Sequence, residues 1–176
     1  MRAGRTSRSA GFTLIELMIG VTILGIIVSM GMPSFKQMLR SAEIRSVAES
    51  VSNGLQRARA EAVARNTRVQ FALGAGTAWA VADRAGTAID SRATDEGSST
   101  STTLTAVAAD GTTAATTITY NQLGQVIANA DASPTLSRVD IVAVGSVRNL
   151  RIVIGTGGSA RVCDPKMVPG SNARAC

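Results

Sequence analysis

The pattern of hydrophobic and polar positions divides the chain into three stretches. From Phe12 to Phe35 almost every residue is apolar or small, and Glu16 is the only ionisable side chain. From Phe35 to Ala62 apolar residues recur at intervals of three and four, which is the spacing of an amphipathic helix. Beyond Asn66 short runs rich in Val, Ile and Thr are separated by Gly, Asn, Asp and Ser. This order predicts a long helix followed by a β-rich domain, an α+β fold.

The first two stretches predict one continuous helix from about Phe12 to Asn66. Gly54 is the only strong helix breaker between Pro33 and Asn66. About 55 residues at 1.5 Å each would make a helix of roughly 80 Å. Its amphipathic half, residues 36–66, continues from Phe35 and is expected to turn one apolar stripe toward the β domain. That stripe consists of Phe35, Met38, Leu39, Ala42, Val47, Ala48, Val51, Leu55, Ala58 and Ala62.

Five segments of the remaining chain have the composition of strands. They are Arg68–Leu73, Trp79–Ala82, Thr117–Tyr120, Arg138–Val144 and Leu150–Gly155. Apolar residues alternate along the last two, which predicts a pair of half-buried antiparallel strands. Residues 83–116 contain few bulky apolar side chains and much Thr, Ser and Ala, so we expect a long exposed loop or a weak hairpin there. A glycosylated or partner-binding loop is the alternative.

Composition gives little support for an enzyme or a nucleic-acid-binding protein. The chain has no His, the commonest general base and metal ligand, and only five aromatic residues. The formal charge is +6, but removal of residues 1–11 would leave 15 basic and 12 acidic residues, or +3. Two Cys without His do not supply a structural zinc site, so we predict no metal and no cofactor. The glycine-rich stretch Gly155–Arg161 lacks the lysine of a phosphate-binding loop and predicts a β-turn.

Glu16 is unexpected in a segment long enough to cross a bilayer. A carboxylate at the centre of a membrane helix costs roughly 2.5 to 3.5 kcal/mol even on lenient insertion scales. Arg2, Arg5 and Arg8 precede the apolar run and predict that the extreme amino terminus stays cytoplasmic. No small-x-small cleavage site follows the run, so an ordinary secretory signal does not fit.

The stretch Gly11-Phe12-Thr13-Leu14-Ile15-Glu16-Leu17 resembles the class III signal of type IV pilins and type II secretion pseudopilins. The resemblance implies that a prepilin peptidase cleaves after Gly11 and that the new amino-terminal Phe12 is methylated. Glu16 would be the fifth residue of the mature chain, as the family pattern requires. Pro33 would be the twenty-second, where pilins commonly carry a helix-bending proline. The alternative is an ordinary membrane anchor with a stray glutamate.

Cleavage after Gly11 would give Glu16 a partner. The new amine of Phe12 would lie one helical turn from the Glu16 carboxylate, in the same subunit or in a neighbour that packs alongside. Because such pairing offsets the desolvation cost, a subunit that supplies the complementary charge is preferred in lipid. Glu16 is therefore predicted to act in assembly. Small residues in this segment also permit close helix packing: Gly20, Gly25, Ser29 and Gly31. The alternative is that these residues have no special role, since glycine is common in membrane helices.

The passage Leu55–Phe71, "LQRARAEAVARNTRVQF", is similar to the helix-to-strand passage of the GspH/FimT (FimT/FimU) group of minor pilins. This resemblance implies the pilin fold, in which a long amino-terminal helix packs on an antiparallel β-sheet domain. It also implies a minor type IV pilin that helps to prime pilus assembly and belongs to the tip complex. A GspH-like minor pseudopilin of type II secretion and a DNA-binding minor pilin of natural transformation are the alternatives.

Two features near the carboxyl end bear on these alternatives. Cys163 and Cys176 predict a disulfide in an oxidising periplasm, whereas two free thiols or an intermolecular bond are the alternatives. Some FimT-type pilins bind DNA through a Gly-Arg-x-Arg motif, but the comparable segment here, Gly158–Arg161, has Ser in place of the first Arg. The default interpretation of the basic residues near this end is scattered solvated charges. The alternative is a DNA-binding patch formed by Arg148, Arg151, Arg161, Lys166 and Arg174.

The predicted organisation is a leader (1–11), a transmembrane helix or filament core (12–35), an amphipathic helix (36–66) and a periplasmic β domain (67–176). The single helix would anchor the chain in the inner membrane, with its carboxyl-terminal domain periplasmic, before it enters a pilus or pseudopilus. The resemblance implies a prepilin peptidase, other major and minor pilins and an inner-membrane assembly platform as partners.

Overall fold

The computed structural model describes residues 11–94, 102–146, 148–170 and 172–176. It divides into two compact units, which meet between Lys36 and Gln37. The helix α1 (Leu14–Ala64) begins in the first unit and ends in the second, so both predicted helix ends lie within two residues of the observed ones. An 18-residue window of α1 has a mean hydropathy of 2.2 and contains no buried residue, and by length and composition this helix could cross a membrane.

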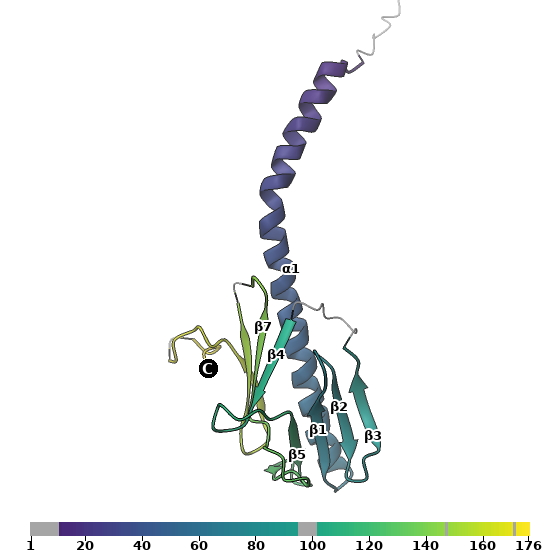
Figure 1. Cartoon of the computed structure of the whole chain (residues 1–176), viewed down its shortest axis with the longest axis vertical. Coiled ribbons are helices and arrows are strands. Elements are labelled where there is room, and N and C mark those ends of the chain that lie inside the picture. Colours follow the sequence, from purple (N-terminus) through teal and green to yellow (C-terminus); the bar gives the residue numbers. More distant parts are fainter. Residues whose placement is uncertain (1–10, 95–101, 147, 171) are drawn as a thin grey trace, which may run out of the picture. The chain divides into compact units, whose positions relative to one another are not determined.

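The second unit contains two antiparallel sheets beside the carboxyl-terminal half of α1 (Figure 1). The first sheet has the order β3-β2-β1-β5-β6, and the second has the order β4-β7-β8-β9. The strands of the first are β1 (Val69–Leu73), β2 (Trp79–Asp83), β3 (Ala88–Arg92), β5 (Thr117–Tyr120) and β6 (Val126–Ile127). Those of the second are β4 (Thr102–Val107), β7 (Arg138–Ala143), β8 (Leu150–Ile154) and β9 (Ala160–Cys163).

One core joins α1 to both sheets. The helix contributes apolar residues at intervals of three and four, and both sheets contribute alternate strand residues. The buried helix residues are Ile44, Val47, Ala48, Val51, Ser52, Gly54, Leu55, Ala58 and Ala62. The predicted stripe is thus confirmed from Val47 to Ala62, but its first part is wrong. Phe35, Met38 and Leu39 are 60%, 68% and 52% exposed, and Ala42 is exposed as well, because the core begins only at Ile44.

The strand predictions are confirmed for β1, β2, β5, β7 and β8, each with an end shifted by no more than one residue. Strands β7 and β8 pair antiparallel, with Val139 opposite Ile152 and Ile141 opposite Leu150, as the alternation of apolar residues indicated. The turn predicted at Gly155–Arg161 joins β8 to β9, and the Gly158 N–H donates to the Gly155 carbonyl at 2.8 Å. The turn is shorter than predicted, since Ala160 and Arg161 already belong to β9.

The prediction of a loop or weak hairpin for residues 83–116 is wrong. The segment holds β3 and β4, and these strands do not pair with each other. Strand β3 pairs with β2 in the first sheet, and β4 pairs with β7 in the second, so the chain passes from one sheet to the other within this segment. Neighbouring strands supply the hydrogen bonds that allow this Thr- and Ser-rich sequence to form strands. Residues 95–101 lie outside the described part.

Candidate assembly surfaces

The first surface is the start of α1, which sets the position of Glu16. Gly11, Phe12 and Thr13 precede the helix, and Glu16 lies in its first turn. The Glu16 N–H donates to Thr13 Oγ1 at 3.3 Å, so Thr13 caps the helix. Thr-x-x-Glu is the sequence signal of a capping box, and it identifies a role for Thr13 that the sequence reasoning missed. The cap fixes the helix to begin at Leu14, the third residue after the predicted cleavage site.

The first part of α1 presents an exposed apolar surface, and its Thr and Ser hydroxyl groups are hydrogen-bonded within the helix. The Thr22 and Ser29 hydroxyls donate to the Ile19 and Ile26 carbonyls, both at 2.8 Å, so neither is left unpaired in an apolar medium. Large apolar residues here, such as Ile15 and Leu24, are more than half exposed. A methyl group added at any of three glycines would meet no atom of the described chain within 4 Å: Gly20, Gly25 and Gly31.

Pro33 lies inside α1. Proline has no N–H, so the carbonyl four residues earlier loses its usual helical donor and the helix is weakened locally. That carbonyl belongs to Ser29. A kink at Pro33 stays a prediction.

The carboxyl-terminal loop is the second surface. The predicted disulfide between Cys163 and Cys176 is present, with Cα atoms 5.1 Å apart. Asp164 organises the loop from its start: its N–H donates to the Arg174 carbonyl at 2.7 Å, and its Oδ1 accepts the Lys166 N–H at 3.0 Å. Because these bonds and the disulfide connect both ends, the loop is held against the end of β9.

The structure separates the five basic residues that were considered for DNA binding. Arg148 and Arg174 line one groove beside the carboxyl-terminal loop, and Arg148 lies 4.0 Å from Asp164 Oδ2. Arg151 is paired with Asp140 on the outer face of the second sheet. Arg161 on β9 is exposed and lies on that same face, since its register partner is Val153, two residues from Arg151. Lys166 is exposed in the carboxyl-terminal loop.

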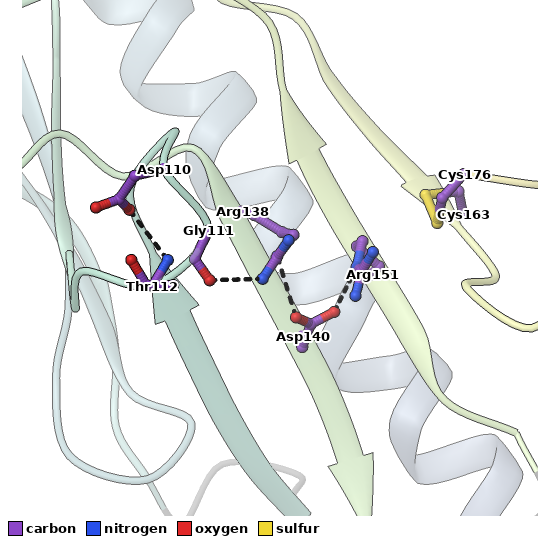
Figure 2. Close-up of polar contacts among 8 residues, drawn as sticks. All are labelled: Asp110, Gly111, Thr112, Arg138, Asp140, Arg151, Cys163 and Cys176. Carbon is purple, nitrogen blue, oxygen red and sulfur yellow. Dashed lines mark hydrogen bonds and ion pairs between the residues drawn. A yellow bond between two sulfur atoms is a disulfide. The ribbon is translucent and has the colours of Figure 1, made fainter.

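The outer face of the second sheet carries a row of paired charges, shown in Figure 2. The Arg151 Nε donates to Asp140 Oδ1 at 2.5 Å, and the Arg138 Nε lies 3.2 Å from Asp140 Oδ2. Arg138 also donates to the Gly111 carbonyl at 3.1 Å, which ties the β4–β5 connection to β7. Two arginines thus share one carboxylate, and Asp140 offsets only part of their combined positive charge.

Asp110 stabilises the turn that receives Arg138. Its Oδ1 accepts the N–H groups of Thr112 and Thr113, each at 3.0 Å, and its Oδ2 accepts the Thr113 hydroxyl. These hydrogen bonds lower the pKa of Asp110 to about 2, because they favour its charged form. The arrangement fixes a surface turn. Within the described ranges, no three His, Cys, Asp or Glu residues are grouped so that they could hold a metal ion.

Two family models match the chain. A prokaryotic amino-terminal methylation motif matches residues 6–32, and the model described as type II transport protein GspH matches residues 47–158, well over half of the chain. The chain belongs to the GspH family. The GspH match covers the buried half of α1 and strands β1 to β8, and the methylation motif covers the segment that contains Gly11, Phe12 and Glu16.

Solved structures confirm the pilin fold of this GspH-family chain. The type IV minor pilin FimU of Pseudomonas aeruginosa (strain PAO1), in a crystal of space group P21, superimposes with a TM-score of 0.57 and 18% identity, covering 76% of this chain and 98% of FimU. A second crystal form, P65, gives a TM-score of 0.50 and 17% identity, with 72% and 98% covered. No curated protein sequence shows significant similarity to the chain.

Proposed function

We propose that this protein is a minor subunit of a type IV pilus, with no catalytic role, that helps to prime assembly and forms part of the tip complex. The chain is cleaved after Gly11, methylated at Phe12 and anchored in the inner membrane by residues 12–35. Its β domain, residues 67–176, is periplasmic. The helix then packs into the filament core with those of other pilins, driven by an inner-membrane assembly platform.

One observation carries this proposal: a methylation motif at residues 6–32 coincides with an exposed apolar helix that has Glu16 in its first turn. A carboxylate is costly in lipid, so its presence in an apolar helix points to a function. Within the described part of the chain, Glu16 makes no ion pair, so its charge is available to the amine of a neighbouring subunit. The fold shared with FimU supports the same conclusion.

Substitution of Glu16 tests the assembly role. Glu16→Ala and Glu16→Leu should insert into the membrane as well as the wild type does, because the helix becomes more apolar. Both should be strongly depleted from sheared filaments, because the complementary charge is lost. Glu16→Gln is the matched control for side-chain size and should behave as Glu16→Ala does. Equal incorporation of the variants and the wild type would reject the role.

Processing is tested by mass spectrometry of the membrane-bound protein. The mature chain should begin at a methylated Phe12. A chain that still begins at Met1, in cells with an active prepilin peptidase, would overturn the proposal.

A minor pseudopilin of type II secretion is the second candidate, favoured by the description of the matching family as a type II transport protein. Both candidates use the same anchor and the same class of β domain. Deletion of the gene separates them: loss of surface pili and motility supports the pilus, whereas loss of exoprotein release with pili intact supports the secretion system. DNA uptake should be scored in the same strain.

A further inference from the structure

A groove of about 490 Å³ lies between α1 and the carboxyl-terminal loop, entirely within the second unit. Its floor is apolar, since it includes Ile44 and Ala48 of the helix, both buried, and Cys163 of β9. Leu150 and Met167 extend this apolar surface on the loop side. The volume lies in the range of ordinary ligand-binding sites, and the floor offers space for an aliphatic side chain.

The rim of the groove is positively charged. Arg45 lies on the helix side, and Arg148 and Arg174 lie on the loop side. Asp164 is buried and offsets the charge of Arg148, which is 4.0 Å away. Glu49 is the other acid that lines the groove. Arg45 and Arg174 are exposed, and within the described residues neither makes an ion pair, so two guanidinium groups on opposite walls remain available.

The loop-side wall is rigid before any partner binds. The disulfide between Cys163 and Cys176 closes the loop, and the Asp164 N–H donates to the carbonyl of Arg174 itself. The backbone that carries Arg174 is therefore fixed against β9, which lowers the entropy lost on binding. The opposite wall is part of the helix α1.

We propose that this groove binds a short peptide segment of a neighbouring filament subunit, in which an aliphatic side chain is adjacent to an aspartate or glutamate. The aliphatic side chain occupies the floor, and the carboxylate lies between Arg45 and Arg174, whose planar guanidinium groups suit carboxylates. The inference rests on the proposed function, since it requires neighbours in a filament. Nucleic acid fits less well, because none of the described residues that line the groove is aromatic and could stack on a base.

Charge reversal in the full-length protein, expressed in cells that lack the wild-type copy, tests the groove. Arg45→Glu combined with Arg174→Glu should lower the amount in sheared filaments by about ten-fold or more, the size of effect of a disrupted interfacial ion pair. The matched control is Arg68→Glu with Arg84→Glu, which reverses two exposed arginines outside the groove. The control should change incorporation by less than about two-fold. Equal effects of the two pairs would overturn the proposal.

A photo-crosslinking amino acid in place of Met167 identifies the occupant. The crosslinked peptide should come from another subunit and contain an acid next to an aliphatic residue. Reversal of that acid to Arg should restore incorporation of the Arg45→Glu and Arg174→Glu chain. A crosslink only to lipid or DNA, a segment without an acid, or no restoration would overturn the proposal.

The two readouts separate the groove from the filament role. If the wild type and the groove variants are incorporated into filaments equally well, the peptide-binding role of the groove is rejected and the filament role of the protein is kept. In the opposite case, the wild-type chain is absent from filaments but Met167 crosslinks to an acidic segment of a membrane protein. That result would reject the filament role and the filament subunit as occupant of the groove. The groove would remain a carboxylate-binding site.

Discussion

Gly54 of α1 lies against the ring of Phe71 of β1: a methyl group at position 54 would come within 2.7 Å of Phe71 Cε2. Trp79 of β2 lies slightly farther away, with its Cδ2 atom 3.0 Å from that methyl group. The two rings stack with centroids 5.9 Å apart, and both are buried. Glycine costs an isolated helix about 1 kcal/mol relative to alanine, so its presence here is explained by the close approach of helix and sheet.

Gly54→Ala is therefore expected to destabilise the protein by about 1 to 3 kcal/mol. The free-energy cost of overpacking the core with a methyl group exceeds the gain in helix propensity from alanine. Urea unfolding of the detergent-solubilised chain, followed by the fluorescence of its single tryptophan, Trp79, measures the change. Gly157→Ala is the control, since a methyl group there meets nothing within 4 Å. A Gly54→Ala chain as stable as the wild type would contradict the explanation.

Asn129 is a buried hydrogen-bonding centre between β5 and the connection that follows β6. Its Oδ1 accepts the Thr119 hydroxyl at 2.9 Å, and the two hydrogens of its Nδ2 are shared among the carbonyls of Thr117, Ser133 and Pro134. Asn129→Ala should destabilise the protein by about 1 to 3 kcal/mol, because buried partners lose their hydrogen bonds. Asn53→Ala, at an exposed helix position, should change the unfolding free energy by less than about 0.5 kcal/mol. Similar losses in both variants would count against this role.

The helix and five strands could be predicted because their periodicity reflects local burial. Alternation along Leu150, Ile152 and Ile154 follows from one face packing on the core, and it survives in the structure. The stripe failed at Phe35, Met38 and Leu39 because sequence periodicity does not show where the β domain stops covering the helix. An apolar residue at helical spacing can face a domain or a neighbouring molecule, and only the folded chain separates these cases.

The missed elements depend on tertiary pairing. Strand β4 contains three threonines and an alanine, and it forms because β7 supplies a complete ladder from Thr102 opposite Ala143 to Val107 opposite Arg138. The charged rim of the groove could not be predicted from the sequence either. Arg45 and Arg174 are far apart in the sequence, and only the fold makes them line one groove. The sequence named Arg174 as a candidate for DNA, but it could not reveal the apolar floor beside it.

The disulfide should contribute to stability by restricting the unfolded chain. Cys163 and Cys176 are 13 residues apart, and closure of a loop of about this size is worth roughly 3 kcal/mol in the chain-entropy model. The double variant Cys163→Ser with Cys176→Ser should show a loss of this order in urea unfolding. Reductant should bring the wild type down to the stability of the variant and leave the variant unchanged. A wild type unaffected by complete reduction would show that the loop contributes little.

Asp110 should make the protein sensitive to acid. Its pKa is lowered from the ordinary value of 3.8 to about 2 in the folded chain, chiefly by the hydrogen bond from the Thr113 hydroxyl. A group with a lowered folded pKa stabilises the fold above its unfolded pKa, and this contribution is lost as the pH falls from about 4 to about 2. The stability difference between the wild type and Asp110→Asn should therefore shrink over this interval.

Urea unfolding of both chains at a series of pH values between about 2 and 6 measures that difference. Glu49→Gln is the control for the loss of one exposed carboxylate, because Glu49 accepts no hydrogen bond within the described residues. NMR titration of the Asp110 carboxyl gives the folded pKa independently. A difference that stays constant with pH, or an Asp110 that titrates near 3.8, would show that the hydrogen bonds of the turn do not favour the charged carboxylate.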